Sequence, residues 1–290
     1  MKKTTFNLQR KQKLVGILVI LFVSIAGFGL SPFRFLEYSS RFEKLLVQIQ
    51  REEITPEAAS KEFSALFRAL HTLSPPLDST ARAKYEWAFP LVNKNYSAIG
   101  GGGRGFRPMG FNLFNHRVRG SHPAHDIFIY DRNHDDKEDV SGAYVPVISM
   151  GDGLVIATEK NWNDSLQTYG GNYVWMYDFQ TGGVWYYAHL REVYVEKAQV
   201  VKKGMPLGLV GRTGKNAAAA RSDTHLHLMY LEIDEAGAPI PVNTYNLLKE
   251  AKTWREPAPA ENHISAWNEI RRLKPKEPNV KTEIKKPLSR

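Results

Sequence analysis

Hydrophobic residues recur at helical spacing in the first part of the chain. Two amphipathic runs share this spacing: Phe42, Leu45, Leu46, Ile49, and then Phe63, Leu66, Phe67, Leu70. Thr55-Pro56-Glu57 has the N-cap residue and the first-turn proline of a helix start, and Ser74-Pro75-Pro76 ends the pattern. The pattern predicts a helical segment over residues 36–76. This segment either forms a separate stalk or packs onto the domain that follows.

From Trp87 onward the pattern changes to short runs rich in Val, Ile, Tyr, Trp and Phe, separated by glycine-bearing turns. This texture is typical of antiparallel strands. Seven strands are expected, at residues 127–130, 145–149, 153–158, 173–179, 184–189, 206–210 and 225–233. The predicted fold is therefore mainly β, with an antiparallel sheet or sandwich over residues 86–250.

The N-terminus carries an apolar run, residues 14–30, in which Ser24 is the only polar residue and which five Lys or Arg residues precede. A basic leader before an apolar run is typical of an export signal. We expect residues 1–33 to form a basic cytosolic leader and a signal anchor, with membrane contact through residues 14–30 and the rest of the chain in the cell envelope. The alternative is secretion after cleavage near Ser24-Ile25-Ala26, which resembles a small-residue cleavage site.

The net charge of +9 belongs to the two tails. Residues 1–13 hold five Lys or Arg and no acid, residues 271–290 hold eight Lys or Arg and two acids, and the remainder is slightly acidic. A basic nucleic-acid-binding face is therefore not expected. Residues 255–290 are predicted to be a disordered, basic tail rich in Pro and Lys. Because the chain has no cysteine, a metal would need His, Asp or Glu ligands.

Three histidine-bearing motifs supply candidate chemistry: HPAHD at 122–126, YYAHL at 186–190 and THLHL at 224–228. His122, Asp126 and His227 have the donor types of a catalytic zinc, which usually takes three protein ligands and a water. Strand alternation places His225 beside His227 on one face. The same alternation places Trp185, Tyr187 and His189 together, which predicts a substrate groove lined by Trp185 and Tyr187 with a histidine at its end.

These motifs resemble those of the lysostaphin and LytM-type zinc endopeptidases, which cleave the peptide part of bacterial peptidoglycan. The resemblance covers residues 89–233 and includes GDGLVIAT at 151–158, GNYVWMYD at 171–178 and VVKKGMPLGLVGRTG at 200–214. It implies a duplicated hybrid motif fold. It also implies one zinc ion per chain, held by His122, Asp126 and His227, with His189 and His225 assisting catalysis and peptidoglycan peptides as substrate. Two departures are Ala124, where the family usually has glycine, and the long stretch KNAAAARSD before THLH.

Other functions remain open at this point. A non-catalytic module that activates another wall hydrolase would lack metal ligands, whereas this chain keeps all five expected residues; a zinc protease with a protein substrate would keep them. His125 is a rival ligand that we interpret as structural or as a support for the ligands, because adjacent strand residues point in opposite directions. Residues 131–136 have the oxygen spacing of a calcium loop but lack its glycine and its final acid, which favours a solvated acidic turn.

Overall fold

The computed structural model describes residues 32–115, 120–166, 168–218 and 222–255. The expected leader and anchor over 1–33 and the expected tail over 255–290 therefore lie almost wholly outside the described residues. No helix in the described ranges is long and apolar enough to cross a membrane.

Two helices come first, α2 (Pro32–Gln50) and α3 (Pro56–Leu73). Helix α3 begins as its sequence predicts: the Thr55 side chain accepts a hydrogen bond from the Ala58 backbone N–H, and Pro56 occupies the first turn. The apolar faces of the two helices meet at Phe42, whose ring lies 6.3 Å from that of Phe63. The helical spacing in the sequence is thus confirmed in both elements.

The strands that follow are antiparallel, as the sequence predicts. The main sheet has the order β1-β11-β7-β6-β5-β9, with β12 paired to β11. Its strands are β1 (Ala124–Phe128), β5 (Gly153–Glu159), β6 (Asn172–Asp178), β7 (Val184–Leu190), β9 (Val200–Val201), β11 (His225–Ile233) and β12 (Pro239–Pro241). A smaller sheet joins β4 (Pro146–Ile148), β10 (Pro206–Leu209) and β8 (Glu192–Val193), and β2 (Lys137–Glu138) pairs with β3 (Ala143–Tyr144).

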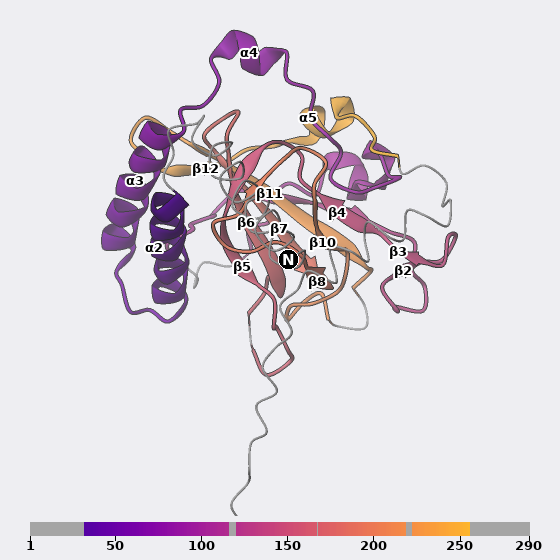
Figure 1. The fold of residues 1–290 in the computed structure, drawn as a ribbon. Coiled ribbons are helices and arrows are strands. Elements are labelled where there is room, and N and C mark those ends of the chain that lie inside the picture. The colour runs from indigo at the N-terminus through magenta and orange to yellow at the C-terminus, as the bar shows by residue number, and fades with distance from the viewer. Residues whose placement is uncertain (1–31, 116–119, 167, 219–221, 256–290) are drawn as a thin grey trace, which may run out of the picture. The chain divides into compact units, whose positions relative to one another are not determined.

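Short helices complete the described chain and flank the sheets (Figure 1). They are α4 (Ser79–Ala83), the 3-10 turns η1 (Tyr96–Ala98) and η2 (Gly100–Gly103), and α5 (Tyr245–Glu250). Of the seven expected strands, the first is displaced: β1 begins at Ala124 instead of Ile127. Ala124 is small and His125 and Asp126 are polar, and so the hydrophobic pattern does not mark the start of this strand.

The main sheet is buried on both faces. One face packs against the small sheet in a core that includes Trp185, Tyr187 and Leu228. The other face packs against α2 and α3, where Phe42 lies 5.7 Å from Trp175 between ring centroids, and the Ser39 hydroxyl donates to the Val155 carbonyl. The helical pair, the main sheet and the small sheet therefore form three successive layers (Figure 1). The helices pack onto the β domain and do not stand apart as a stalk.

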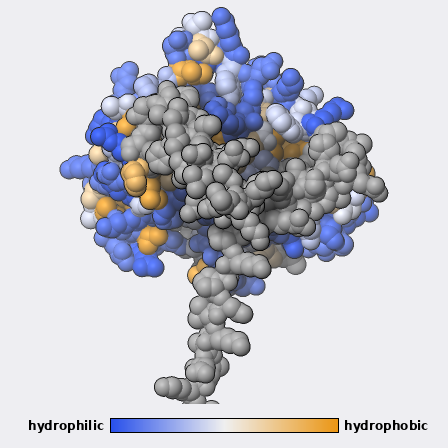
Figure 2. Space-filling model, viewed as in Figure 1, coloured by the Kyte–Doolittle hydropathy of each residue, from blue (hydrophilic) through white to orange (hydrophobic). Residues whose placement is uncertain are grey.

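The surface differs from this interior in composition. On the face drawn in Figure 2, the described surface is mostly hydrophilic, and apolar side chains emerge in small separate patches. Scattered apolar side chains of this kind are normal for a folded domain and do not by themselves mark a binding surface.

Candidate active site

The three predicted metal ligands meet where β1 lies beside β11. In the antiparallel register of these strands, Asp126 is directly opposite His227, and His122 lies two residues before the start of β1. The Asp126 carboxylate lies 3.2 Å from His122 Nε2 and 3.0 Å from His227 Nδ1. One ligand atom from each residue falls within 4.8 Å of the other two. Two imidazole nitrogens and one carboxylate oxygen thus converge as a metal site requires.

The charges in this cluster are strongly coupled. Burial by itself would raise the pKa of the Asp126 carboxyl, but hydrogen bonds from His122 and His227 outweigh burial and hold this pKa far below its usual range. In turn, the hydrogen bond to Asp126 raises the pKa of His122. The Asp126 carboxylate is therefore an anion that lies between the imidazoles of His122 and His227. Its negative charge favours the binding of a cation.

His189 and His225 lie beside the cluster. The His189 ring centroid is 4.9 Å from that of His225 and 5.4 Å from that of His227. His189 Nδ1 lies 2.8 Å from the Thr213 carbonyl oxygen, and His225 Nδ1 lies 2.6 Å from the Asp223 carbonyl oxygen. Since a carbonyl only accepts, each Nδ1 carries the proton and each Nε2 keeps a free lone pair.

Burial keeps both of these histidines neutral. It lowers the pKa of His225, and together with the neighbouring imidazoles it lowers the pKa of His189 to about 3. The Nε2 atoms of two neutral imidazoles are proton acceptors. Such a pair, next to a site for a cation, is suited to taking a proton from a bound water.

A groove of about 610 Å³ contains all five residues. Besides these five, its lining includes Gly120, Ser121, Tyr169, Gly170, Tyr186, Asn216, Ala217 and Ser222. The tyrosines and the small polar residues offer an aromatic wall and hydrogen-bonding groups to an extended ligand. The groove is open, and an extended ligand could reach all five residues from it.

Residues 138–240 match the sequence model of peptidase family M23. The chain contains a family M23 peptidase domain. His189, His225 and His227 fall inside the matched range, whereas His122 and Asp126 precede it. The resemblance inferred from the motifs is thus confirmed, and the structure adds the two residues that complete the cluster.

Individual relatives agree with this family. The chain is 33% identical over 101 residues to the peptidoglycan DD-endopeptidase ShyB of Vibrio cholerae, which covers 33% of this chain and 21% of ShyB. It is 33% identical over 104 residues to the DD-endopeptidase ShyA of the same organism, covering 35% of this chain and 20% of ShyA. The match thus spans about a fifth of each relative. Among solved structures, the catalytic domain of lysostaphin from Staphylococcus simulans is 20% identical, with 60% of this chain and 98% of that chain covered and a TM-score of 0.32.

Trp185 and Tyr187, the two aromatic residues that were predicted to line the groove, do not lie there. Trp185 is 1% exposed and Tyr187 is 0% exposed, and both side chains pack in the core between the two sheets. The prediction that they bind substrate is therefore wrong. The aromatic residue that β7 contributes to the groove is the one between them, Tyr186.

The cause of this error is the backbone of His189. Its φ of 63° lies in the left-handed region, so the alternation of side chains along β7 breaks at this residue. His189 turns onto the groove face, although Trp185 and Tyr187 point to the opposite face. The strand register explains why Tyr186 faces the groove: it pairs with Met229, which lies two residues from His227 on the same strand face. The sequence alone does not give this register.

His125 points away from His122, Asp126 and His227, as predicted. Its Nε2 lies 3.0 Å from Asn243 Oδ1, and its ring packs at 5.9 Å from Phe106 and 6.0 Å from Tyr245. The His125 side chain is thus buried in the interior.

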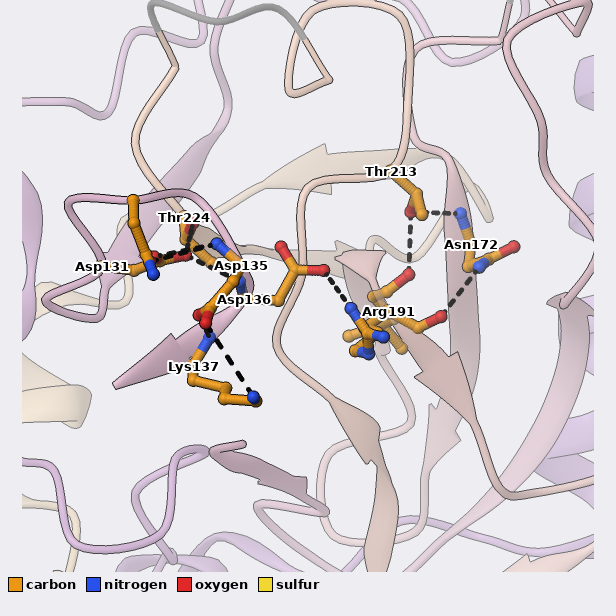
Figure 3. Close-up of polar contacts among 10 residues, drawn as sticks. Asp131, Asp135, Asp136, Lys137, Asn172, Arg191, Thr213 and Thr224 are labelled. Atoms are coloured by element: carbon orange, nitrogen blue, oxygen red, sulfur yellow. Dashed lines mark hydrogen bonds and ion pairs between the residues drawn. The ribbon is translucent and has the colours of Figure 1, made fainter. Parts of the chain in front are cut away.

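The acidic turn at 131–136 is organised by donors of the protein itself (Figure 3). The Asp131 carboxylate accepts hydrogen bonds from the Thr224 hydroxyl at 2.6 Å and from the backbone N–H groups of Asp135 and Asp136. Asp136 pairs with Arg191 at 2.8 Å. Because Thr224 immediately precedes His225, this turn helps to fix the start of β11 at the groove.

Proposed function

We propose that this chain is a zinc-dependent endopeptidase that hydrolyses peptide bonds of bacterial peptidoglycan during remodelling of the cell wall. The observation that carries the proposal is the convergence of His122, Asp126 and His227, with the Nε2 atoms of two neutral histidines beside them. Membership of the M23 peptidase family supports peptide hydrolysis, and the relatives named above support peptidoglycan as the substrate class.

The donor set fits zinc. Two imidazole nitrogens, one carboxylate and no thiolate are a common ligand set of catalytic zinc sites, which leave one position for water. Bound zinc would lower the pKa of that water to ~7 and polarise the scissile carbonyl. The Asp126 anion supplies the charge that a divalent cation requires.

The remaining chemistry belongs to the protein. His225 Nε2, which lies 3.7 Å from Asp126 Oδ1, is placed to accept the proton of the attacking water, with His189 Nε2 beside it. A histidine that has taken this proton becomes a cation and an N–H donor, and can stabilise the oxyanion that develops on the scissile carbonyl. Tyr169 and Tyr186 would flank the peptide in the groove.

The experiment that tests this proposal is digestion of purified peptidoglycan. The zinc-loaded protein is incubated with sacculi with and without a chelator, and released muropeptides are identified by mass spectrometry. Loss of cross-linked dimers that stops with chelator and returns with zinc would support the proposal and name the bond. Intact sacculi in the presence of a folded, zinc-loaded protein would contradict it and point to a regulatory module or a protein substrate.

We further propose that the protein acts in the cell envelope, anchored by residues 14–30 with the peptidase domain outside the cytoplasmic membrane. The apolar run and its basic leader support this location. The test is fractionation followed by intact-mass measurement. A membrane-bound protein that retains residue 1 agrees with an anchor, whereas a soluble form beginning after Ala26 would show a cleaved signal.

A further inference from the structure

His189 holds a conformation that its neighbours on the strand do not explain. With a φ of 63° it lies in the left-handed region, which residues other than glycine, asparagine and aspartate seldom occupy. Two hydrogen bonds hold it there: its backbone N–H donates to the Gly170 carbonyl at 2.9 Å, and its Nδ1 donates to the Thr213 carbonyl at 2.8 Å. Both acceptors lie in loops outside β7. The orientation of the imidazole therefore depends on where those loops are held.

The loop that carries Thr213 is fixed by the hydroxyl of the same residue. Thr213 Oγ1 accepts from the Asn172 backbone N–H at 2.8 Å and donates to the Leu190 carbonyl at 2.8 Å (Figure 3). These two bonds connect the loop to the first residue of β6 and to the last residue of β7. The hydroxyl thus fixes the position of the Thr213 carbonyl, which accepts the hydrogen bond from His189 Nδ1–H.

Close packing leaves this loop little other freedom. A Cβ at Gly171, whose φ is +64°, would lie 2.3 Å from the Thr213 carbonyl carbon. A Cβ at Gly214, whose φ is +102°, would lie 2.2 Å from the Tyr169 carbonyl oxygen and 3.1 Å from His189 Nδ1. Both glycines are needed because the loop passes directly against the groove wall and the imidazole.

Asn172 supports the arrangement from behind. Its side chain is buried, with Oδ1 accepting from the Trp162 backbone N–H at 2.9 Å and Nδ2 donating to the Arg191 carbonyl at 3.3 Å. Arg191 is in turn paired with Asp136. Asn172, whose backbone N–H donates to the Thr213 hydroxyl, is therefore held by hydrogen bonds of its own. The hydroxyl joins the start of β6 to the end of β7 (Figure 3).

We propose that Thr213 is a positioning residue: its hydroxyl fixes the carbonyl that keeps the His189 proton on Nδ1 and directs Nε2 into the groove. The effect on turnover rests on the proposed function, but the effect on the tautomer and orientation of His189 does not. Groups that orient a site residue in this way typically change activity about 10- to 100-fold when they are removed.

The test compares Thr213→Val, which removes the hydroxyl and keeps the shape, with Thr213→Ser, which keeps the hydroxyl. The full chain is labelled with ¹⁵N, and the protonated ring nitrogen of each histidine is identified by long-range ¹H–¹⁵N NMR, with His189 assigned from a His189→Gln variant. Wild type and Thr213→Ser should show His189 protonated on Nδ1. Thr213→Val should lose this single tautomer and lower kcat on sacculi about 10- to 100-fold, with KM and zinc content close to wild type.

The two readouts separate the two proposals. Wild-type protein that leaves sacculi intact would contradict the proposed function, while the NMR comparison would still decide the role of Thr213. A Thr213→Val protein with the wild-type tautomer would overturn the positioning role, and so would a Thr213→Ser protein that behaves as Thr213→Val does. If Thr213→Val does not fold, Thr213→Ala takes its place in the same comparison.

Discussion

His225 and His227 share one face of β11, separated by a single residue, yet their surroundings differ. His227 Nδ1 is bonded to the Asp126 carboxylate, whereas His225 Nδ1 donates to a backbone carbonyl and turns its Nε2 to the groove. We therefore propose the first as a ligand and the second as a proton acceptor. Their proposed roles can therefore be separated by substitution, even though the residues are almost adjacent.

His227→Ala is expected to lose both zinc and activity, because it removes one of three ligands. His225→Ala is expected to retain zinc and to lose about 10²- to 10⁴-fold in rate, the usual contribution of a general base. Metal analysis of the folded variants, together with muropeptide release, measures both effects. Normal zinc content in His227→Ala would contradict its assignment as a ligand, and an unimpaired rate in His225→Ala would contradict its assignment as a base.

Zinc affinity should fall as the pH falls. The hydrogen bond to Asp126 raises the pKa of His122, so its imidazole keeps a proton at a higher pH than a histidine usually does, and zinc must displace that proton. Affinity should therefore be highest above this pKa and weaken below it. Competition with a chromophoric chelator between about pH 8 and about pH 5.5 measures the change. An affinity that stays constant across this range would show that His122 is not a ligand.

At the residue scale, the sequence was sufficient to predict which histidines and which aspartate gather in the candidate site. His122, Asp126, His189, His225 and His227 stand out because they lie in the ordered motifs HPAHD, YYAHL and THLHL, and the structure brings them together. The supporting groups were not predicted. Thr213 acts through a backbone carbonyl and a hydroxyl, and the inversion at His189 is a matter of φ, which the pattern of side-chain types does not reveal.

At the scale of elements, the helical pair is an integral layer of the structure. Rings of α2 and α3 pack on the outer face of the main sheet, and Phe67 is fully buried between Phe42 and Tyr177, with ring centroids 5.9 and 6.1 Å away. Phe63 of α3 also contacts Phe114, which lies 5.5 Å away in the segment leading to His122. The helices thus contact both the sheet and, through Phe114, a segment that precedes His122.

Phe67→Ala should lower the free energy of unfolding by about 3–5 kcal/mol, the cost of removing a buried aromatic ring and leaving a cavity. Arg68→Ala, at the adjacent exposed position of the same helix, is the matched control and should change it by less than about 0.5 kcal/mol. Urea denaturation of both variants measures the difference. Equal effects would mean that α3 is not packed on the sheet in solution.

The sequence predicted the long elements well and the short ones poorly. The helices and most of the longer strands follow from periodicity, since each carries its own hydrophobic pattern. Strands of two residues, such as β8 and β9, carry no such pattern and exist only because a longer strand pairs with them. Strand β1 was displaced because its ligand-bearing half is polar, so its start is set by pairing with β11.

For the molecule as a whole, the main sheet is shared by two cores. Removing the helical pair would expose the face that carries Trp175, Tyr177 and Met229, which are at most 5% exposed in the complete structure. The helices and the sheet should therefore unfold together as one cooperative unit.

A protein that begins at residue 77 is expected to aggregate or to lose a sharp thermal transition, because a large apolar face would be in water. A protein that begins at residue 32 is the control and should be monomeric with a single transition. Size-exclusion chromatography and calorimetry compare the two. A monomeric 77–290 protein with the melting temperature of the control would show that the helices are dispensable for the fold.

The packing of α2 also bears on how far from the membrane the proposed active-site groove could lie. Helix α2 starts at Pro32, and Phe35 and Ser39 in its first two turns are buried. The apolar run ends at Leu30, which leaves Ser31 alone between it and the folded body. With the proposed anchor in place, one residue of sequence would separate the membrane segment from α2, so the proposed cleavage would be confined to wall strands that come within one domain's width of the membrane. Inserting a long flexible linker after Ser31 would extend that radius without altering the groove.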